Sequence, residues 1–320
     1  MPAHRLAGLD GSSVVVEVPA SSANLGAGYD CLGVALAMTN RIELEVRVWS
    51  RGEIELTVDG EGRNELTEDR ENRFVRGIEA ALRLALGDLP DGIGWRIGMR
   101  NQIPLSRGLG SSAAATVGGV LAGNALAGEP LSRPELLRLA TQIEEHPDNA
   151  AAALLGGFVV SASTAAGVEA IRFDAPRELR AVLYIPDLRL STRDMRAALP
   201  ASVPLVDAAA NLAAVAVGVA GLATGHHELL GRLTVDRLHE PYRAAVYPQL
   251  PAMVAAAREA GAIGACLSGA GSTIIAFTDT AAGTGAVETA FGEAAARLDL
   301  TGRVRSIELR NTGARVVARA

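Results

Sequence analysis

A glycine- and serine-rich segment, P-L-S-R-G-L-G-S-S-A-A at residues 104–114, runs directly into an alanine- and valine-rich stretch. Gly108 and Gly110 let the backbone adopt conformations that other residues avoid, and they let a ligand approach the main chain closely. Ser111 is a preferred N-cap residue, so a helix is predicted to begin there. Unpaired N–H groups at the start of a helix attract anionic oxygen atoms. The segment therefore predicts a phosphate-binding loop, with a plain Gly-Ser turn before a packed helix as the alternative.

Lysine is absent from the chain, so all 30 of its basic side chains other than histidine are arginines. A Walker-type loop places a lysine on the nucleotide phosphates, and a protein kinase needs a strand lysine. Both architectures are therefore excluded, as is Schiff-base chemistry on lysine. The loop also lacks the G-x-G-x-x-G spacing of dinucleotide-binding folds. A phosphate site in this chain depends on backbone dipoles, hydroxyl groups, arginine and a metal ion.

Length and composition indicate a soluble protein of two domains, with one large domain as the alternative. The 320 residues are 49% hydrophobic, and we expect the domain boundary near residue 165. A net charge of −6 without a basic tract argues against nucleic acid and anionic membranes as partners. Cys31 and Cys266 give no disulfide framework, which fits a reducing cytoplasm. The most apolar run, residues 212–224, is too short to span a bilayer and is predicted to be a buried helix.

Two neighbouring segments, residues 41–49 and 53–58, alternate between apolar and charged side chains as half-buried strands do. An Arg-Gly turn separates them, so we predict an antiparallel hairpin. Apolar residues at helical spacing predict helices at residues 72–86 and 206–223. Helices and strands then alternate as far as a final predicted strand at residues 303–309.

Two polar clusters flank predicted core segments. The loop at residues 21–30, S-S-A-N-L-G-A-G-Y-D, follows a predicted strand, and its Asn24 and Asp30 can recognise an amino group or a hydroxyl. The cluster E-E-H-P-D-N at residues 144–149 ends a helix because Pro147 cannot continue it. Carboxylates there can share a divalent cation with phosphate oxygens and a serine hydroxyl. An ordinary turn and a solvated helix end are the respective alternatives.

Several ordered motifs resemble those of the GHMP kinases, a superfamily named for galactokinase, homoserine kinase, mevalonate kinase and phosphomevalonate kinase. They are P-A-S-S-A-N-L-G-A-G-Y-D-C-L-G at 19–33, the loop at 104–114 and S-G-A-G-S-T at 268–273. E-E-H-P-D-N, L-S-T-R-D-M-R at 190–196 and E-P-Y-R at 240–243 are similar to the homoserine kinase branch. The resemblance implies an α+β fold with a ribosomal-protein-like N-terminal domain, residues 1–165, and a ferredoxin-like C-terminal domain, residues 166–320.

The resemblance also implies the reaction and its cofactors. A kinase of this branch uses ATP and Mg²⁺ to phosphorylate the side-chain hydroxyl of L-homoserine, on the route to threonine. The residues that would surround the ATP phosphates are Pro104, Leu105, Ser106, Arg107, Gly108, Leu109, Gly110, Ser111, Ser112, Ala113 and Ala114. Ser112 and Glu144 are the expected magnesium-linked pair, with Glu145 as the alternative carboxylate.

By the same resemblance, the substrate-binding residues would be Asn24, Asp30, Thr192, Arg196 and Arg243. Asp30 would pair with the ammonium group, and the two arginines would hold the carboxylate, a task that suits their planar fork of donors. The expected catalytic residues are Asn149, His146 and Asp148. Asp148 is either a general base or a carboxylate that faces away from the hydroxyl.

Two other functions compete with this reading. Another small-molecule kinase of the superfamily would act on mevalonate, shikimate or a sugar, none of which carries an ammonium group for Asp30. A ligand sensor without catalysis is the second competitor, and the presence of Ser112 and Glu144 argues against it. We further expect a homodimer.

Overall fold

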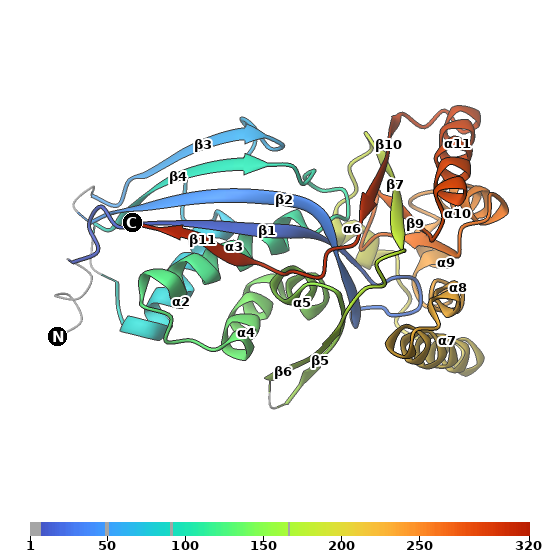
Figure 1. Ribbon diagram of the computed structural model, residues 1–320, viewed down its shortest axis with the longest axis horizontal. Coiled ribbons are helices and arrows are strands. Elements are labelled where there is room, and N and C mark those ends of the chain that lie inside the picture. The colour runs from blue at the N-terminus through green and yellow to red at the C-terminus, as the bar shows by residue number, and fades with distance from the viewer. Residues whose placement is uncertain (1–7, 49–50, 90–91, 166) are drawn as a thin grey trace.

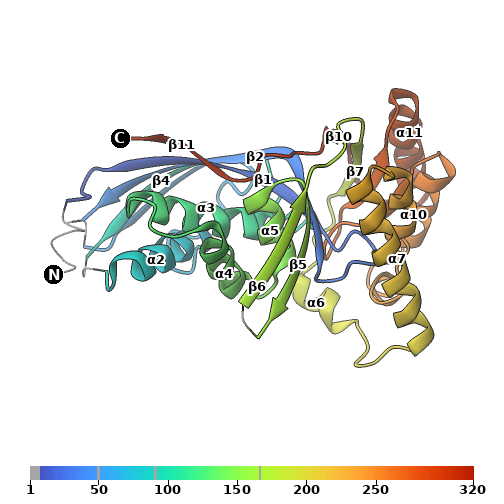
Figure 2. The same cartoon turned by 60° about the horizontal axis from the view of Figure 1, so that its bottom comes forward.

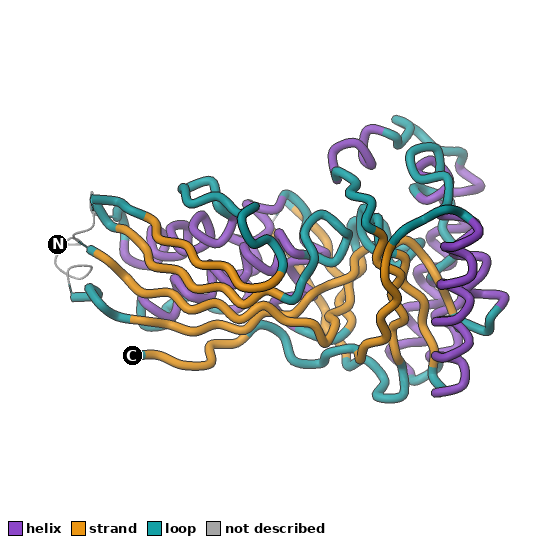
Figure 3. Tube along the Cα trace, turned by 90° about the horizontal axis from the view of Figure 1, so that it is seen from above, coloured by secondary structure: helices purple, strands orange, loops and turns teal. Residues whose placement is uncertain are grey.

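The computed structural model describes residues 8–48, 51–89, 92–165 and 167–320, which form an elongated molecule of mixed α+β architecture (Figure 1). Within these residues, two β-sheets carry the fold, one with seven strands and one with four. The long sheet lies at the end that holds the C-terminus, and the shorter sheet stands against it at the other end (Figure 3). The α+β class agrees with the prediction.

The first sheet has the strand order β11-β1-β2-β4-β3, and β5 pairs with both β2 and β6. Its strands are β1 Ser13–Ala23, β2 Leu32–Arg47, β3 Ile54–Gly60, β4 Gly94–Asn101, β5 Phe158–Thr164, β6 Gly167–Phe173 and β11 Arg315–Arg319. Four helices cover one face of it: α2 Arg73–Leu86, α3 Ser111–Leu126, α4 Arg133–Glu144 and α5 Pro147–Leu155 (Figures 1 and 2). In β1 every second residue from Val14 to Val18 is buried, so the alternating sequence directs its valines to the core.

The predicted hairpin between residues 41–49 and 53–58 is wrong. Both segments are strands where they are described, but β3 pairs in parallel with β4, and β4 pairs antiparallel with β2. β4 therefore lies between the two strands that were expected to be neighbours. Alternation shows that one face of a strand is buried, yet it carries no information about which strand lies beside it.

The second sheet has the order β10-β7-β9-β8 and is antiparallel throughout. Its strands are β7 Arg180–Pro186, β8 Gly264–Leu267, β9 Ile274–Thr278 and β10 Gly302–Glu308. Helices α10 Leu250–Glu259 and α11 Ala281–Arg297 pack against it through a core that includes Phe291 and Met253. The predicted strand at 303–309 is present as β10, but it is not the last one. The chain continues to β11, which returns to the first sheet and pairs with β1.

The remaining elements lie between β7 and α10 in the chain. They are α6 Thr192–Ala197, α7 Leu205–Thr224, the 3₁₀ turn η1 His227–Leu229, α8 Leu230–Leu233 and α9 Glu240–Arg243. Residue 165, the predicted domain boundary, lies in the turn between β5 and β6, and both of these strands belong to the first sheet. The domain limits stay a prediction.

Helix α7 is not the buried helix that the sequence predicts. It is longer than the apolar run that indicated it and, with a mean hydropathy of 1.8, is long and apolar enough to cross a membrane by length and composition alone. Its buried residues are Asn211, Gly218, Gly221 and Leu222, and the opposite face is exposed. A helix that is apolar all round gives no periodicity from which the buried side can be read.

Glu240 in α9 makes stability depend on pH. Although the residue as a whole is partly exposed, its carboxylate reaches inward and accepts the Leu267 N–H at 2.7 Å. Burial raises the pKa of Glu240 from 4.5 to about 7. The pKa is higher in the folded than in the unfolded chain, so stability is lost as the pH rises from about 4.5 through 7, by up to about 3 kcal/mol.

We therefore expect Glu240→Gln to be more stable than the wild type at pH 8, because the amide keeps an acceptor without becoming charged. The difference should shrink toward zero at pH 4.5. Urea denaturation at both pH values measures it. Glu259→Gln, at an exposed position on α10, is the matched control and should leave the pH dependence unchanged. Equal pH dependence in Glu240→Gln and the wild type would contradict the assignment.

Candidate active site

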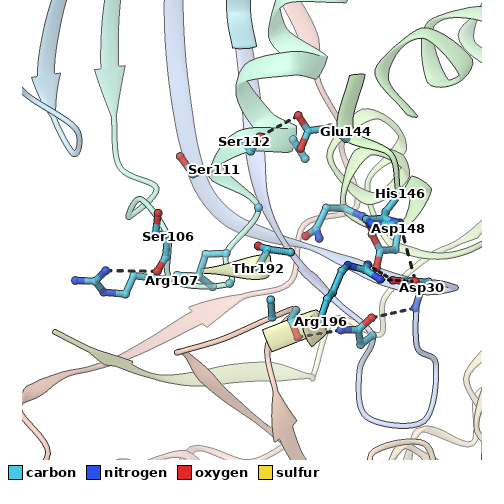
Figure 4. Close-up of a pocket in the computed structure, with 18 of the residues that line it drawn as sticks. Asp30, Ser106, Arg107, Ser111, Ser112, Glu144, His146, Asp148, Thr192 and Arg196 are labelled. Carbon is cyan, nitrogen blue, oxygen red and sulfur yellow. Dashed lines mark hydrogen bonds and ion pairs between the residues drawn. The ribbon is translucent and has the colours of Figure 1, made fainter. Parts of the chain in front are cut away.

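A cavity of about 220 Å³ lies where the loop before α3, the start of α5, α6 and α9 meet (Figure 4). It is lined by Asn24, Asp30, Ser106, Arg107, Gly108, Leu109, Gly110, Ser111, Ser112, Ala113, Glu144, His146, Asp148, Asn149, Thr192, Arg196, Arg243, Gly269 and Ala270. The wall thus includes every residue that the motifs predicted for substrate, metal or catalysis except Glu145, the alternative metal carboxylate. Of the predicted phosphate loop, Pro104, Leu105 and Ala114 lie outside it.

The loop before α3 is held by two glycines at positive φ, 72° for Gly108 and 70° for Gly110. A Cβ on Gly108 would lie 2.1 Å from the Ser268 carbonyl oxygen, and one on Gly110 would lie 2.1 Å from the Ser21 hydroxyl. Both positions therefore exclude a side chain. The Arg107 side chain, although it belongs to the cavity wall, points away from the other labelled side chains (Figure 4). Its guanidinium donates to the carbonyls of Pro186 and Asp187 at 2.6 and 2.7 Å.

Helix α3 starts differently from its prediction. Gly110 is the N-cap, in the left-handed conformation, and Ser111 is the first helical residue, so the prediction that Ser111 caps the helix is wrong. No side chain caps this end. Ser111, Ser112 and Ala113 line the cavity at the first turn, where the backbone N–H groups have no partner within the helix. An uncapped helix start at a cavity favours an anion.

Glu144, the last residue of α4, faces this helix start. Ser112 Oγ donates to Glu144 Oε1 at 2.9 Å, and Thr116 Oγ1 donates to the same atom at 2.6 Å. The side chain is 13% exposed, and Arg73 Nη1 lies 3.9 Å from Oε1. Thr116 was missed in the sequence, although it lies four residues after Ser112 and so on the same side of α3.

Glu145, the alternative carboxylate, has a different environment. It is the C-cap of α4 with φ 71°, it is exposed, and it is not part of the cavity wall. The geometry therefore favours Glu144 as the carboxylate that acts in the cavity.

A second helix starts at the cavity. Pro147 ends α4 as predicted and is also the first residue of α5, with His146 as its N-cap. Ser21 Oγ donates to Asn149 Oδ1 at 2.9 Å, which fixes the side-chain amide. The Asp148 carboxylate accepts the Asn149 N–H at 2.7 Å. Burial raises the pKa of Asp148 to about 6, an effect that the Asn149 N–H partly opposes.

Charged side chains line the opposite end of the cavity. Arg196 donates two hydrogen bonds to the Asp30 carboxylate, at 3.0 and 2.6 Å. The loop that carries Asp30 is held in turn by Asn24, whose Oδ1 accepts the Asp30 N–H at 3.0 Å and whose Nδ2 donates to the Gly269 carbonyl at 2.9 Å. Asp30 and Arg196 thus form an ion pair between the first loop of the chain and α6.

Arg243 is the most deeply buried of the charged side chains at this end of the cavity, with 1% of its surface exposed. Its guanidinium donates to the carbonyls of Met195 and Gly269 at 3.3 and 3.0 Å, and burial lowers its pKa. The ring of Tyr29 lies against both arginines, with centroid distances of 5.4 Å to Arg196 and 5.5 Å to Arg243. Its hydroxyl accepts from Arg196 at 2.6 Å. Tyr29 was missed because its neighbours come from distant segments.

Two predicted residues complete the wall. His146 Nδ1 lies 4.0 Å from Asp30 Oδ2, and burial, followed by the charge of Arg196, lowers the pKa of the imidazole. The environment therefore favours the neutral ring. Thr192 is the first residue of α6, directly after its N-cap Ser191, and its side chain is exposed to the cavity region (Figure 4).

A second cavity, of about 310 Å³, lies on the other side of the phosphate loop and shares Ser106, Ser111 and Ser112 with the first. It was not predicted. Its remaining lining is mostly apolar or amide, including Leu66, Met99, Leu105, Asn40 and Asn72. The lining comes from β2, β4, the phosphate loop with the start of α3, and residues 65–73 before and at the start of α2, which include the charged Glu65, Glu71 and Arg73.

The residues at the cavity suit a magnesium ion that is shared with substrate phosphates. They do not suit a metal ion that is held by protein side chains alone. In the described part of the chain, no group of three or more His, Cys, Asp or Glu side chains converges on one point. Glu144 with the Ser112 hydroxyl offers one carboxylate and one hydroxyl. That small donor set fits Mg²⁺, which is usually bound by one or two carboxylates together with substrate phosphates.

Comparison with known proteins identifies the family. The model of the GHMP kinases N terminal domain matches residues 72–157, and that of the GHMP kinases C terminal matches residues 219–295. A homoserine kinase of Moorella thermoacetica is 43% identical over 263 residues, which cover 82% of this chain and 86% of that relative. One from Synechococcus sp. (strain WH7803) is 40% identical and covers 95% of both chains.

A solved structure agrees with these matches. The crystal structure of homoserine kinase from Cytophaga hutchinsonii aligns with a TM-score of 0.84 at 30% identity and covers 95% of this chain and 97% of that one. The predicted two-part α+β fold is thereby confirmed. The chain belongs to the homoserine kinase family of the GHMP kinases.

Proposed function

We propose that the protein transfers the γ-phosphoryl group of ATP to the side-chain hydroxyl of L-homoserine and so forms O-phospho-L-homoserine and ADP, on the route to threonine. One observation carries this proposal: a single cavity has two chemically different ends. Two helix N-termini and Glu144 line one end, which suits phosphates and a cation. Asp30, Arg196 and Arg243 line the other end, which suits an amino acid. The names of the relatives support the same reaction.

ATP would occupy both cavities. The mostly apolar cavity beside Leu105 and Met99 would take the nucleoside, and the loop at residues 106–113 would surround the phosphates. Ser112 and Glu144 would hold Mg²⁺, which neutralises phosphate charge when it is bound. The backbone N–H groups at the start of α3 supply the positive potential that a lysine provides in other phosphate loops.

The amino acid would replace the ion pair at the other end of the cavity. Its ammonium group takes the place of Arg196 beside Asp30, and its carboxylate binds Arg196 together with Arg243. Asn24 and Thr192 complete this pocket. The side-chain hydroxyl then points toward Asn149, whose orientation Ser21 fixes.

In the reaction, the hydroxyl oxygen forms a bond to the γ-phosphorus, and the bond from that phosphorus to the bridging oxygen of ADP breaks. The hydroxyl proton leaves to solvent or to a phosphate oxygen. The transition state is loose, so the protein contributes mainly by positioning and charge stabilisation. Asn149 and His146 align the hydroxyl, and the two helix N-termini stabilise the transferred group.

Asp148→Asn separates general base catalysis from positioning. The Asp148 carboxylate accepts the Asn149 N–H and thereby shapes the first turn of α5. Asparagine keeps that acceptor, so we expect kcat at pH 8 to fall by less than about tenfold. A loss of several orders of magnitude would make Asp148 the base. Single-turnover phosphoryl transfer measured with saturating homoserine isolates this step from substrate binding.

We also propose the setting in which the reaction takes place. Residues 1–165 form the ATP-binding domain, and residues 166–320 form the domain that completes the substrate site. The enzyme is cytoplasmic and acts as a homodimer.

A coupled ADP-release assay tests the proposed reaction. It uses Mg-ATP with L-homoserine, L-threonine, mevalonate, shikimate and galactose as separate acceptors. Selective turnover of L-homoserine is expected, because it alone offers a primary hydroxyl together with both charges. Turnover of an acceptor without an ammonium group would remove the assigned roles of Asp30, Arg196 and Arg243. No ADP release with any of them would favour a ligand sensor.

A further inference from the structure

His239 is a fully buried histidine directly before α9, and it lies behind the cavity wall without being part of it. Its Nδ1 lies 3.1 Å from Nη1 of Arg243, and its Nε2 lies 2.8 Å from the carbonyl oxygen of Gly26. Gly26 belongs to the loop at residues 21–30, which carries Asp30. The imidazole therefore connects the arginine that would bind the carboxylate with the loop that would bind the ammonium group.

The partners of His239 determine which ring nitrogen carries the proton. An arginine guanidinium can only donate, so Nδ1 is the acceptor in the contact with Arg243. A carbonyl oxygen can only accept, so Nε2 carries the hydrogen. The ring is thus held as the neutral Nε2–H tautomer. Burial acts in the same direction and lowers the pKa of His239, as does the charge of Arg243, whereas the carboxylates of Asp236 and Asp30 oppose this shift.

The remaining contacts of Arg243 show what the imidazole adds. Nε donates to the carbonyl of Met195 at 3.3 Å, and Nη1 donates to the carbonyl of Gly269 at 3.0 Å as well as to His239. Nη2 has no hydrogen-bond partner among the residues that the structure describes. Because the guanidinium is planar, contacts at Nε and Nη1 fix its orientation and leave the N–H groups of Nη2 for a ligand. Arg243 belongs to the cavity wall, so that ligand would enter through the cavity.

The imidazole is itself held in place. The Asp236 side chain has no exposed surface, and its Oδ2 accepts the backbone N–H of His239 at 2.8 Å and lies 3.7 Å from the ring nitrogen Nε2. The ring of Tyr29 packs against the imidazole, with 5.3 Å between the two centroids. The backbone, the ring and both ring nitrogens of His239 therefore all have fixed neighbours.

We propose that His239 is a positioning residue for the amino acid substrate: its Nδ1 orients the Arg243 guanidinium toward the substrate carboxylate, and its Nε2–H ties this arginine to the loop that carries Asp30. Histidine suits the position because one neutral ring accepts from a cation at one edge and donates to a carbonyl at the other. The role rests on the proposed function, since the carboxylate concerned is that of the proposed substrate.

Asparagine and glutamine separate the two edges of the ring. The Asn amide ends where Nδ1 lies, so His239→Asn keeps an acceptor for Arg243. The Gln amide ends where Nε2 lies, so His239→Gln keeps the donor to Gly26 and loses that acceptor. In initial-rate measurements, KM for L-homoserine should stay within about threefold of the wild type in His239→Asn and rise at least about tenfold in His239→Gln. KM for ATP should stay unchanged in both.

A purely structural role of His239 would not distinguish the two variants. Both lose the ring that packs against Tyr29, so urea denaturation should show a similar loss of stability in each. An equal KM for L-homoserine in both variants, or a higher one in His239→Asn, would overturn the proposal. Wild-type ADP release with L-homoserine is measured first. Its absence would contradict the proposed function, whereas wild-type turnover without a difference between the variants would contradict only the role of His239.

Nitrogen-15 NMR of the histidine-labelled wild type provides a test that needs no folded variant. The chemical shifts of the two ring nitrogens distinguish the neutral tautomers from each other and from the protonated ring. We expect the neutral Nε2–H tautomer for His239 at pH 7. An Nδ1–H tautomer or a protonated ring cannot accept from Arg243 and would overturn the proposal.

Discussion

Glu144→Gln is expected to lower kcat for phosphoryl transfer by about a thousandfold, the loss typical of removing a preorganised electrostatic group at a reacting phosphate. The amide keeps the size of the side chain and an oxygen that can accept from Ser112 and Thr116. The fold should therefore remain intact, and only the negative charge that would face the proposed Mg²⁺ is lost. Turnover measured by ADP release, with Mg²⁺ varied, should show a higher magnesium requirement as well as the lower rate.

Glu145→Gln is the matched control for this experiment. It makes the same chemical change one residue later, on an exposed side chain outside the cavity wall. Its kcat should stay within about twofold of the wild type, as is usual for a surface substitution. If Glu145→Gln lost the activity and Glu144→Gln kept it, the magnesium assignment would pass to Glu145.

Arg196→Ala should raise KM for L-homoserine by about a hundredfold and leave KM for ATP within about twofold. Hydrogen bonds to charged groups contribute about 1.5–3 kcal/mol each, and a hundredfold change corresponds to about 3 kcal/mol. In the free protein, Arg196 makes two such bonds to Asp30, and in the proposed complex it exchanges them for the substrate carboxylate. Initial rates with each substrate varied in turn separate the two Michaelis constants.

Arg193→Ala is the control on the same helix. Arg193 is exposed and does not line the cavity, so its loss removes a positive charge without removing the proposed contact. A similar rise in the homoserine KM for both variants would mean that net charge, and not the Arg196 contact, matters. An equal rise in KM for ATP and for L-homoserine in Arg196→Ala would contradict the assignment of Arg196 to the amino acid end of the cavity.

Much of the cavity could be predicted because its residues lie in short motifs whose physical requirements are local. Gly108 and Gly110 provide positive φ where no side chain fits, and Pro147 both ends α4 and begins α5. Such local requirements can be recognised in the sequence from a few neighbouring residues. The same holds for helix α2, Arg73–Leu86, which agrees with the predicted range 72–86 to within one residue and lies between the caps Asn72 and Gly87.

Other features could not be predicted because they depend on partners that are distant in sequence. The ring of Tyr29 meets Arg196 and Arg243 only after three segments fold together. The parallel pairing of β3 with β4 depends on a strand that comes later in the chain. The exposure of Leu212 depends on which side of a uniformly apolar helix meets the rest of the protein.

The return of β11 to the first sheet also affects synthesis. Until residues 315–319 leave the ribosome, β1 has no partner on its outer side, although β2 to β6 have all been made. The nascent N-terminal half therefore exposes an unpaired strand edge, the kind of edge that templates aggregation. Final closure of that half waits for the codons of residues 315–319. A ribosome that stops just before residue 315 would release a chain with every site residue present and its main sheet still open.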